Sequence, residues 1–519
     1  MILLPMPAAT VPAHGVLSDD PAGGFTRVPR GLVLAWSAAF VLIAFRSAMI
    51  VFQPQLAFHA DQGVIGLMAK HLIQGRAFPL FIYGQNYLLG VEAWLAAPVF
   101  LVAGVSVAAL KLPLLVINVA IGLLLVTLLY RESGLSPTLA LIASLFFVLA
   151  PPGTAAELLA ASGGNVEPFL YVLLLWLLRT RPVWFGVVLG VGFLHREFTA
   201  YGALAIVLLE LISGRWRGKA KAELVGAFQV LRVVAEVWLV SQFLRQWASA
   251  AGPGTDASMI TLRGNDLIEA IGKFCFDPGT VLGGVASLVT VHWSRLFGTA
   301  PLPVLDLGLE SDSRQGLAWS GIVLGATMVL FAARIIAHAS RRADWWTRYE
   351  FCAYLILVGA ISALAIAVSR CGDVTVLRYD LLSLVGAVGL AAWGLSVESR
   401  PWIRRTEIAV LLCWALVSGV AHARIYSVYS HHPRIADKIL IIRALDARDI
   451  RYAVSDYWIA YYITFFTNER IVVAADDFRR IHSYDQEVAS HRDVAVKISR
   501  TACGDAKPII DGVYFCPLD

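Results

Sequence analysis

Long apolar stretches separated by short polar connections dominate the first 425 residues of the chain. A helix that crosses a bilayer needs about 20 mostly apolar residues. Eleven stretches meet or approach this length: 31–53, 108–130, 136–151, 167–180, 183–195, 198–213, 222–243, 317–340, 350–368, 376–396 and 406–425. A twelfth apolar stretch, 88–105, is ambiguous by length alone. The pattern predicts a polytopic bundle of membrane helices.

Basic residues decide how the ambiguous stretch is placed. Short cytoplasmic loops carry an excess of Lys and Arg. Sixteen basic residues fall in six connections that share one side of the membrane only if 88–105 does not cross it. We therefore predict eleven spans, a cytoplasmic tail over 1–30, and outer loops over 54–107 and 244–316, with 88–105 lying on or dipping into the outer face. The chain start lacks a basic n-region and an obvious cleavage site, so 31–53 is expected to be an uncleaved span.

Composition narrows the function classes. Hydrophobic residues make up 58% of the 519 positions and charged residues only 15%, with a mean hydropathy of +0.70. Soluble proteins carry about 25% charged residues, so a soluble enzyme, a disordered protein and a nucleic-acid binder are excluded. The net charge of +5 comes from basic loops and reflects topology. Six cysteines are too few for a disulfide-built scaffold.

The pattern changes past residue 430, where charged residues become frequent and no apolar run is long enough to span. Helical patterns near 434–448 and 457–467 alternate with strand patterns at 452–454, 471–474, 494–498 and 512–516, with a polar helical stretch between the second and third strands. This alternation predicts a small α/β domain over 426–519 on the outer side. Cys503 and Cys516 flank a turn-rich stretch in this oxidising compartment, so they are candidates for a disulfide.

Polar side chains gather on the outer side, beginning just past the first span. Asp61 opens an amphipathic helical stretch, where it is either a helix cap or a functional carboxylate. The aromatic and amide-rich segment that follows, with Tyr83, Gln85 and Tyr87, suits either an interfacial belt or sugar binding. Ionisable residues near membrane depth usually face a cavity, and here they include Glu92, Glu167, His195, Arg196, Glu197, Arg370, Arg378 and Asp380. Together they suit chemistry on a phosphate-bearing lipid, because arginine binds phosphate bidentately and a carboxylate can accept a hydroxyl proton.

Three patches resemble one family. Asp61 with the following GVIGLMAKHLIQGRAFPLFIYGQNY and LLGVEAWLAAPVF is similar to the first outer loop of GT-C glycosyltransferases. The branch is that of protein O-mannosyltransferases and aminoarabinose transferases. Arg378-Tyr379 resembles the arginine–tyrosine motif of that branch, and 451–474 resembles the outer domain of its uncharacterised bacterial members.

The resemblance implies an all-α polytopic GT-C-like fold with a small outer α/β domain, in the inner membrane with that domain in the periplasm. It implies a polyprenyl-phosphate sugar donor and an inverting transfer to a hydroxyl of a glycan, lipid or protein. Asp61 matches the catalytic base, and Arg378 matches the arginine near the lipid phosphate. Two positions depart from the family: Gln62 replaces a second acid that many relatives carry, and Asp380 replaces an apolar residue.

We expect the other outer-side residues to complete the site. Arg370 or Lys70 would assist at the phosphate. The sugar pocket would be shaped by Glu167 and His195-Arg196-Glu197, with Tyr83, Gln85 and Tyr87 at its mouth. A divalent metal is compatible with His59 or Glu167 as an additional ligand. No glycine-rich phosphate loop is present, so a nucleotide-sugar donor is not supported.

Two alternatives from other classes stay open at this point. A transporter or flippase for a lipid-linked sugar would also need outer-side polar groups, although transporters often show internal repeats and broken midplane helices, which the sequence lacks. The other alternative is a catalytically inactive relative that binds glycolipid or a partner through its tail. It stays open because Gln62 replaces the second acid that many relatives carry.

Overall fold

The computed structural model describes residues 28–85, 88–214, 220–250, 281–299, 319–341, 346–368, 377–431, 435–504, 508–510 and 512–518. Most of the predicted outer loop 244–316 lies outside these residues.

Helices form the membrane part of the protein, and each of the eleven predicted stretches contains one. Among the described residues, six helices include a segment long and apolar enough to cross a membrane: α1 (Arg30–Phe52), α4 (Val107–Glu132), α10 (Ala220–Ala250), α14 (Trp319–Arg341), α15 (Trp346–Val368) and α17 (Pro401–His431). The other predicted stretches form shorter helices: α5 (Pro137–Val148), α7 (Glu167–Leu178), α8 (Pro182–His195), α9 (Ala200–Ser213) and α16 (Ser383–Val397). The protein is a multi-pass membrane protein, and the number of crossings stays a prediction.

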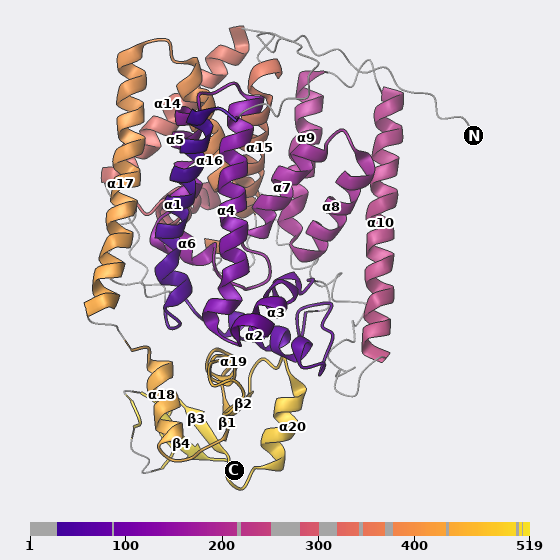
Figure 1. Ribbon diagram of the computed structural model, residues 1–519, viewed down its shortest axis with the longest axis vertical. Coiled ribbons are helices and arrows are strands. Elements are labelled where there is room, and N and C mark those ends of the chain that lie inside the picture. Colours follow the sequence, from indigo (N-terminus) through magenta and orange to yellow (C-terminus); the bar gives the residue numbers. More distant parts are fainter. Residues whose placement is uncertain are drawn as a thin grey trace.

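The outer surface of this bundle is apolar. Leu34 on α1, Phe228 on α10 and Leu416 on α17 are each more than 60% exposed. Water would penalise so large an apolar surface, whereas lipid does not. The backbone polar groups are satisfied within the helices, as hydrocarbon requires. In Figure 1 these helices run side by side, and the C-terminal domain lies at one end of the bundle.

Two short helices of the predicted first outer loop, α2 (Ala60–Ile73) and α3 (Val91–Ala103), lie between the bundle and the C-terminal domain (Figure 1). The 13 residues of α3 extend only about 20 Å, which is short of the roughly 30 Å of hydrocarbon. The shorter helices of the bundle have similar lengths, so length alone does not settle whether 88–105 crosses.

A buried lysine fixes the entry into α2. The Lys111 ammonium donates hydrogen bonds to the carbonyls of Ile50, Leu56 and Ala57, at 2.9 to 3.2 Å. The Gln62 side chain donates to the same Ala57 carbonyl at 2.8 Å. The turn before α2 is therefore held from both sides, which fixes the start of the helix that carries Asp61.

The C-terminal domain is a four-stranded sheet with helices, as predicted. Its elements are α18 (Asp437–Asp446), β1 (Tyr452–Ser455), α19 (Tyr457–Phe466), β2 (Val472–Ala475), α20 (His482–Ser490), β3 (Val496–Ser499) and β4 (Tyr514–Pro517). The strand order is β2-β1-β3-β4, in which β1 pairs in parallel with both β2 and β3 and β4 runs antiparallel to β3. Helix α17 continues to His431, six residues past the predicted domain boundary at 425.

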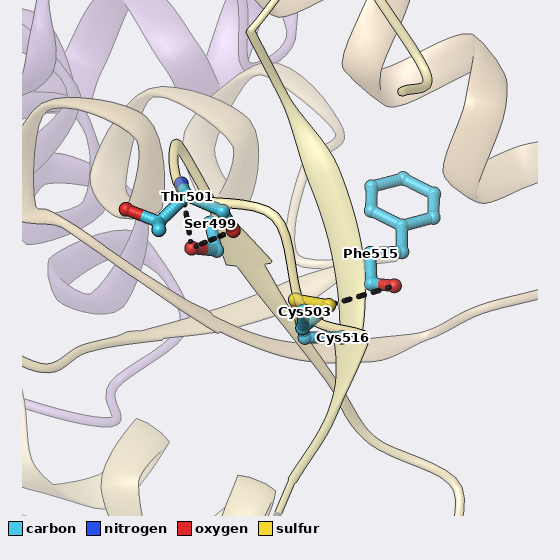
Figure 2. The surroundings of a disulfide bond; sticks show 5 residues. All are labelled: Ser499, Thr501, Cys503, Phe515 and Cys516. Carbon is cyan, nitrogen blue, oxygen red and sulfur yellow. Dashed lines mark hydrogen bonds between the residues drawn. A yellow bond between two sulfur atoms is a disulfide. The ribbon is translucent and has the colours of Figure 1, made fainter. Parts of the chain in front are cut away.

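The predicted disulfide between Cys503 and Cys516 is present, with a Cα–Cα separation of 5.8 Å. Figure 2 shows that it ties the segment after β3 to strand β4. The Ser499 hydroxyl shapes the turn before Cys503, because it donates to the Thr501 carbonyl and accepts from the Thr501 N–H.

Close packing of α19 on α2 joins the two domains. A Cβ added to Gly63 would come within 2.5 Å of the Tyr461 carbonyl oxygen, and one added to Gly66 would clash with the Phe465 ring. These two glycines therefore let α19 approach the face of α2. The Phe58 ring, just before α2, packs against Tyr462 and Phe465 with centroids 5.3 and 5.5 Å apart.

Candidate active site at the domain junction

A cavity of about 350 Å³ opens between α2 and the C-terminal domain. Both domains supply its walls. The lining residues are Asp61, Val64, Ile65, Ile82, Gln85, Ser162, Arg196, Arg378, Tyr457, Trp458, Asp477, Phe478 and Arg480. Four of the residues singled out from the sequence are among them: Asp61, Gln85, Arg196 and Arg378.

Asp61 lies in the first turn of α2, but its side chain does not cap that helix. One carboxylate oxygen accepts a hydrogen bond from the Tyr457 hydroxyl at 2.5 Å, and the other faces the Arg378 guanidinium at 3.4 Å. The carboxylate is about one-fifth exposed. Asp61 is thus a partly open carboxylate held between a residue of each domain.

The surroundings keep Asp61 ionised. Burial opposes its ionisation, but the charges and hydrogen bond around it outweigh burial and lower its pKa below the ordinary value. A protonated His59 imidazole would add to this effect. However, burial lowers the pKa of His59 to about 4, so that this imidazole is neutral at pH 7. We therefore attribute the ionised state at neutral pH to the Tyr457 hydrogen bond and the Arg378 charge.

Two arginines of the membrane domain flank one aromatic ring. Arg378, in the short helical turn Leu377–Tyr379, lies 5.2 Å from the Tyr379 ring centroid, and Arg196, just after α8, lies 5.6 Å from the same ring. Arg196 also contacts the Phe198 ring at 4.9 Å. Stacking against rings leaves the guanidinium edges available for planar, bidentate binding of an oxyanion.

A third arginine enters from the C-terminal domain. Arg480 donates to the Tyr83 carbonyl at 3.1 Å and lies over the Phe478 ring at 4.3 Å. Gly84, next to Tyr83, has φ of +71° and would collide with Arg480 if it carried a Cβ. This turn sets Gln85 at the cavity wall.

The C-terminal residues of the cavity follow two neighbouring parallel strands. Tyr457 and Trp458 come shortly after β1, and Asp477 and Phe478 come shortly after β2. Ligand sites of open α/β sheets form outside the carboxyl ends of such strands. Asp477 links the two turns, because its carboxylate accepts from the backbone N–H groups of Tyr457 and Phe478 at 2.8 and 2.7 Å. Sequence analysis did not identify these residues, although the strand pattern carried the signal.

Lys70 does not line the cavity. Its ammonium lies 2.6 Å from the Glu469 carboxylate and donates to the Asn468 carbonyl at 2.9 Å. The same carboxylate accepts from the hydroxyl of Tyr484 at 2.7 Å and from Arg76 at 2.8 Å, and it lies 3.2 Å from the His71 imidazole. We define the docking cluster as Lys70, His71, Arg76, Glu469 and Tyr484. Because Glu469 already neutralises the Lys70 ammonium, we assign the donor phosphate to other residues.

The remaining predicted residues lie elsewhere. Tyr83 hydrogen-bonds to His71 at 3.1 Å beside the docking cluster, and His59 packs edge-on against Trp458 with centroids 6.2 Å apart. Glu197 is exposed. Glu167 and His195 are buried and do not line the cavity. Tyr87 and Arg370 lie outside the described residues.

A metal site at Asp61 would need further ligands. Among the described residues, the group of three potential metal-binding side chains whose donor atoms lie within 4.8 Å of one another is Glu92, Glu167 and His195, without Asp61 or His59. Glu167 therefore belongs to a cluster with Glu92 and His195 that does not include Asp61. The residues around Asp61 do not form a metal centre in this part of the chain, so we derive no step through a metal there.

No protein-family model and no curated protein matches the chain. Among solved structures, the chain is similar to ArnT from Cupriavidus metallidurans bound to undecaprenyl phosphate, with a TM-score of 0.55, 11% identity, and 91% of this chain and 94% of that chain covered. It is also similar to the apo oligosaccharyltransferase of Archaeoglobus fulgidus, with a TM-score of 0.51, 14% identity and coverages of 90% and 69%. A complex of the Archaeoglobus fulgidus enzyme AglB with an inhibitory peptide and a dolichol-phosphate gives a TM-score of 0.50 at 13% identity and the same coverages. These neighbours are GT-C glycosyltransferases, and the predicted GT-C-like fold is confirmed.

Proposed function

We propose that this protein is a membrane glycosyltransferase that moves a sugar from a polyprenyl-phosphate donor to an acceptor hydroxyl on the outer side of the inner membrane. The observation that carries the proposal is the pairing of the ionised Asp61 with Arg378 at the wall of a cavity between the membrane and C-terminal domains. A base and an anion-binding group are thus adjacent where lipid-borne and water-borne substrates would meet.

The donor phosphate is assigned to Arg378 and Arg196. Both guanidiniums line the cavity and neither is bound bidentately by a carboxylate among the described residues. Charge-assisted hydrogen bonds from arginine to a phosphate are shorter and stronger than the 3.4 Å contact that Arg378 now makes with Asp61. Phosphate binding would therefore draw Arg378 away and leave one Asp61 oxygen free for the acceptor.

Asp61 then acts as general base. The acceptor oxygen attacks the anomeric carbon, its proton passes to Asp61, and the bond from that carbon to the phosphate oxygen breaks with inversion. The leaving phosphate keeps the bonding electrons and is stabilised by the arginines. Tyr457 holds the other Asp61 oxygen at 2.5 Å, which fixes the direction of the carboxylate during this step.

The C-terminal domain supplies the acceptor side. Trp458 and Phe478 present aromatic surfaces to the cavity, and Asp477 presents a carboxylate. Aromatic rings stack on the apolar faces of sugars, and a carboxylate accepts hydrogen bonds from hydroxyl groups. The turns after β1 and β2 therefore form the part of the wall suited to binding an acceptor.

The test is transfer from radiolabelled polyprenyl-phosphate sugars in proteoliposomes that hold the purified protein and extracted cell-envelope acceptors. We expect Asp61→Asn to reduce turnover by about 10²- to 10⁴-fold, the usual contribution of a general base. Asp449→Asn is the matched control, because Asp449 is 82% exposed and its φ of 52° suits asparagine.

Turnover by Asp61→Asn within a few-fold of the unmodified protein would refute the base assignment. Donor that is bound or moved between leaflets without any transfer, by either protein, would refute the enzyme and favour a flippase or an inactive glycolipid-binding relative.

A further inference from the structure

A second cluster of ionisable side chains is buried apart from Asp61 and does not line the cavity. Glu92 comes from α3, Glu167 begins α7 and His195 ends α8. Each side chain is at most 2% exposed, and one potential ligand atom from each lies within 4.8 Å of the others. The proposed transfer reaction does not use this cluster.

Glu92 is held as an oriented acceptor. Its two oxygens accept hydrogen bonds from the backbone N–H groups of Gly163 and Gly164, at 2.7 and 3.0 Å. Both glycines have positive φ, of 91° and 88°, and a Cβ on Gly164 would come within 3.2 Å of His195 Nε2. The loop is therefore shaped to fix one carboxylate and to leave room beside the imidazole.

The other two side chains present unused polar atoms. The Glu167 carboxylate makes no hydrogen bond of ordinary geometry and is close only to the backbone N–H groups of Val166 and of Glu167 itself, and Nε2 of His195 has no partner among the described residues. The opposite ring nitrogen, Nδ1 of His195, lies 2.9 Å from the Tyr171 hydroxyl. If Nδ1 carries the proton and donates to Tyr171, Nε2 presents a lone pair to the carboxylates. Metal-binding histidines are usually oriented by such a bond from their second ring nitrogen.

Two buried carboxylates close together are costly, since the low dielectric strengthens their repulsion and both lose water. The charge of Arg196 acts on both carboxylates but does not outweigh their burial, and no salt bridge within 4 Å joins either of them to a Lys or Arg among the described residues. A divalent cation would neutralise both charges and occupy the free Nε2.

We propose that Glu92, Glu167 and His195 bind one divalent transition-metal ion, of which Zn²⁺ fits best. Two carboxylates and an imidazole are zinc ligands, and donors around zinc at about 2.1 Å lie roughly 3.4 Å apart in a tetrahedron. Side-chain movements of about an ångström would close the observed cluster to that size. The ion joins α3, α7 and α8 and fixes Arg196, which follows His195 and donates to the Gly163 carbonyl at 3.2 Å.

The test is metal content of the purified full-length protein in detergent. After removal of metal with a chelator and reloading with Zn²⁺, elemental analysis should find one equivalent in the unmodified protein. Glu167→Gln should weaken Zn²⁺ binding at least 10-fold. Glu197→Gln is the matched control, because this exposed carboxylate lies two residues from His195 and outside the cluster.

Two measurements keep the result independent of the variants' folding and of the proposed transfer. Co²⁺ loaded into the unmodified protein should show the visible absorption of a low-coordinate site with a nitrogen ligand. Asp61→Asn should keep its equivalent of Zn²⁺ even if transfer is lost. Reloaded protein that holds no more Zn²⁺ than Glu167→Gln, with no Co²⁺ absorption, would overturn the inference and leave the carboxylates as a proton-sharing pair.

Discussion

Replacement of Glu469 by glutamine tests whether the docking cluster holds the C-terminal domain against α2. Glutamine keeps the shape of the side chain but removes its negative charge. Lys70 and Glu469 are only 7% and 11% exposed, and their charged atoms are 2.6 Å apart. Glu469→Gln therefore leaves a nearly buried ammonium without its counter-ion.

The magnitude follows from this burial. Loss of one partner of a buried ion pair costs about 3–5 kcal/mol. The contact with Arg76, whose side chain is 46% exposed, adds less than about 1 kcal/mol. At 1.4 kcal/mol for each tenfold change, the equilibrium between docked and undocked domains should shift roughly 140- to 4,000-fold toward the undocked state.

Hydrogen exchange in detergent measures this shift. Backbone amides of α2 and α19 become exchangeable when the domains separate, so their protection should fall by the same factor in Glu469→Gln. Glu487→Gln on α20 is the matched control. The double variant Lys70→Met with Glu469→Gln should recover much of the protection, because the unpaired ammonium is gone.

Protection of α2 and α19 unchanged within a factor of three would refute this reasoning. Domain docking would then depend on the apolar contacts of Phe58 with Tyr462 and Phe465, and the ion pair would contribute nothing net.

Three further outcomes are expected. Arg378→Ala should weaken binding of undecaprenyl phosphate by about 10- to 150-fold, the loss of one charged hydrogen bond of 1.5–3 kcal/mol, and Arg451→Ala, at an exposed position, should not. Reduction of the disulfide between Cys503 and Cys516 should destabilise the C-terminal domain by about 3 kcal/mol, measured by its thermal unfolding with and without reductant. Docking of the C-terminal domain should weaken in acid. Burial in the folded protein lowers the pKa of the His71 imidazole below its ordinary 6.5. The stability that neutral His71 contributes is therefore complete above pH 6.5 and is lost as the pH falls through the folded pKa. Amide protection of α2 that rises on acidification would contradict this last expectation.

Local pattern was sufficient to predict the helical bundle and the small α/β domain. Apolar length and basic connections located α1, α4 and α17, and alternation located all four strands to within about two residues. The short helices were less certain because apolar runs of 12 to 15 residues fit a buried helix as well as a span.

The cavity was predictable only in part, because it joins residues far apart in the chain. Asp61 and Arg378 carried a signal as ionisable groups beside apolar spans. The sequence contained no such signal for Tyr457 and Arg480, because polar and aromatic residues are ordinary in a water-exposed domain. The partner of Lys70 is Glu469, almost 400 residues away, and no local pattern specifies such a pairing.

Because the turns after two strands reach the cavity, its walls come from two domains that fold in different surroundings. Asp61, Arg196 and Arg378 belong to segments anchored in the membrane domain, whereas the turns after β1 and β2 belong to a domain that folds in water. Substitutions in those turns can therefore reshape one wall without altering any side chain that faces lipid. Under the proposed function, such substitutions would change the acceptor while the donor side stays the same.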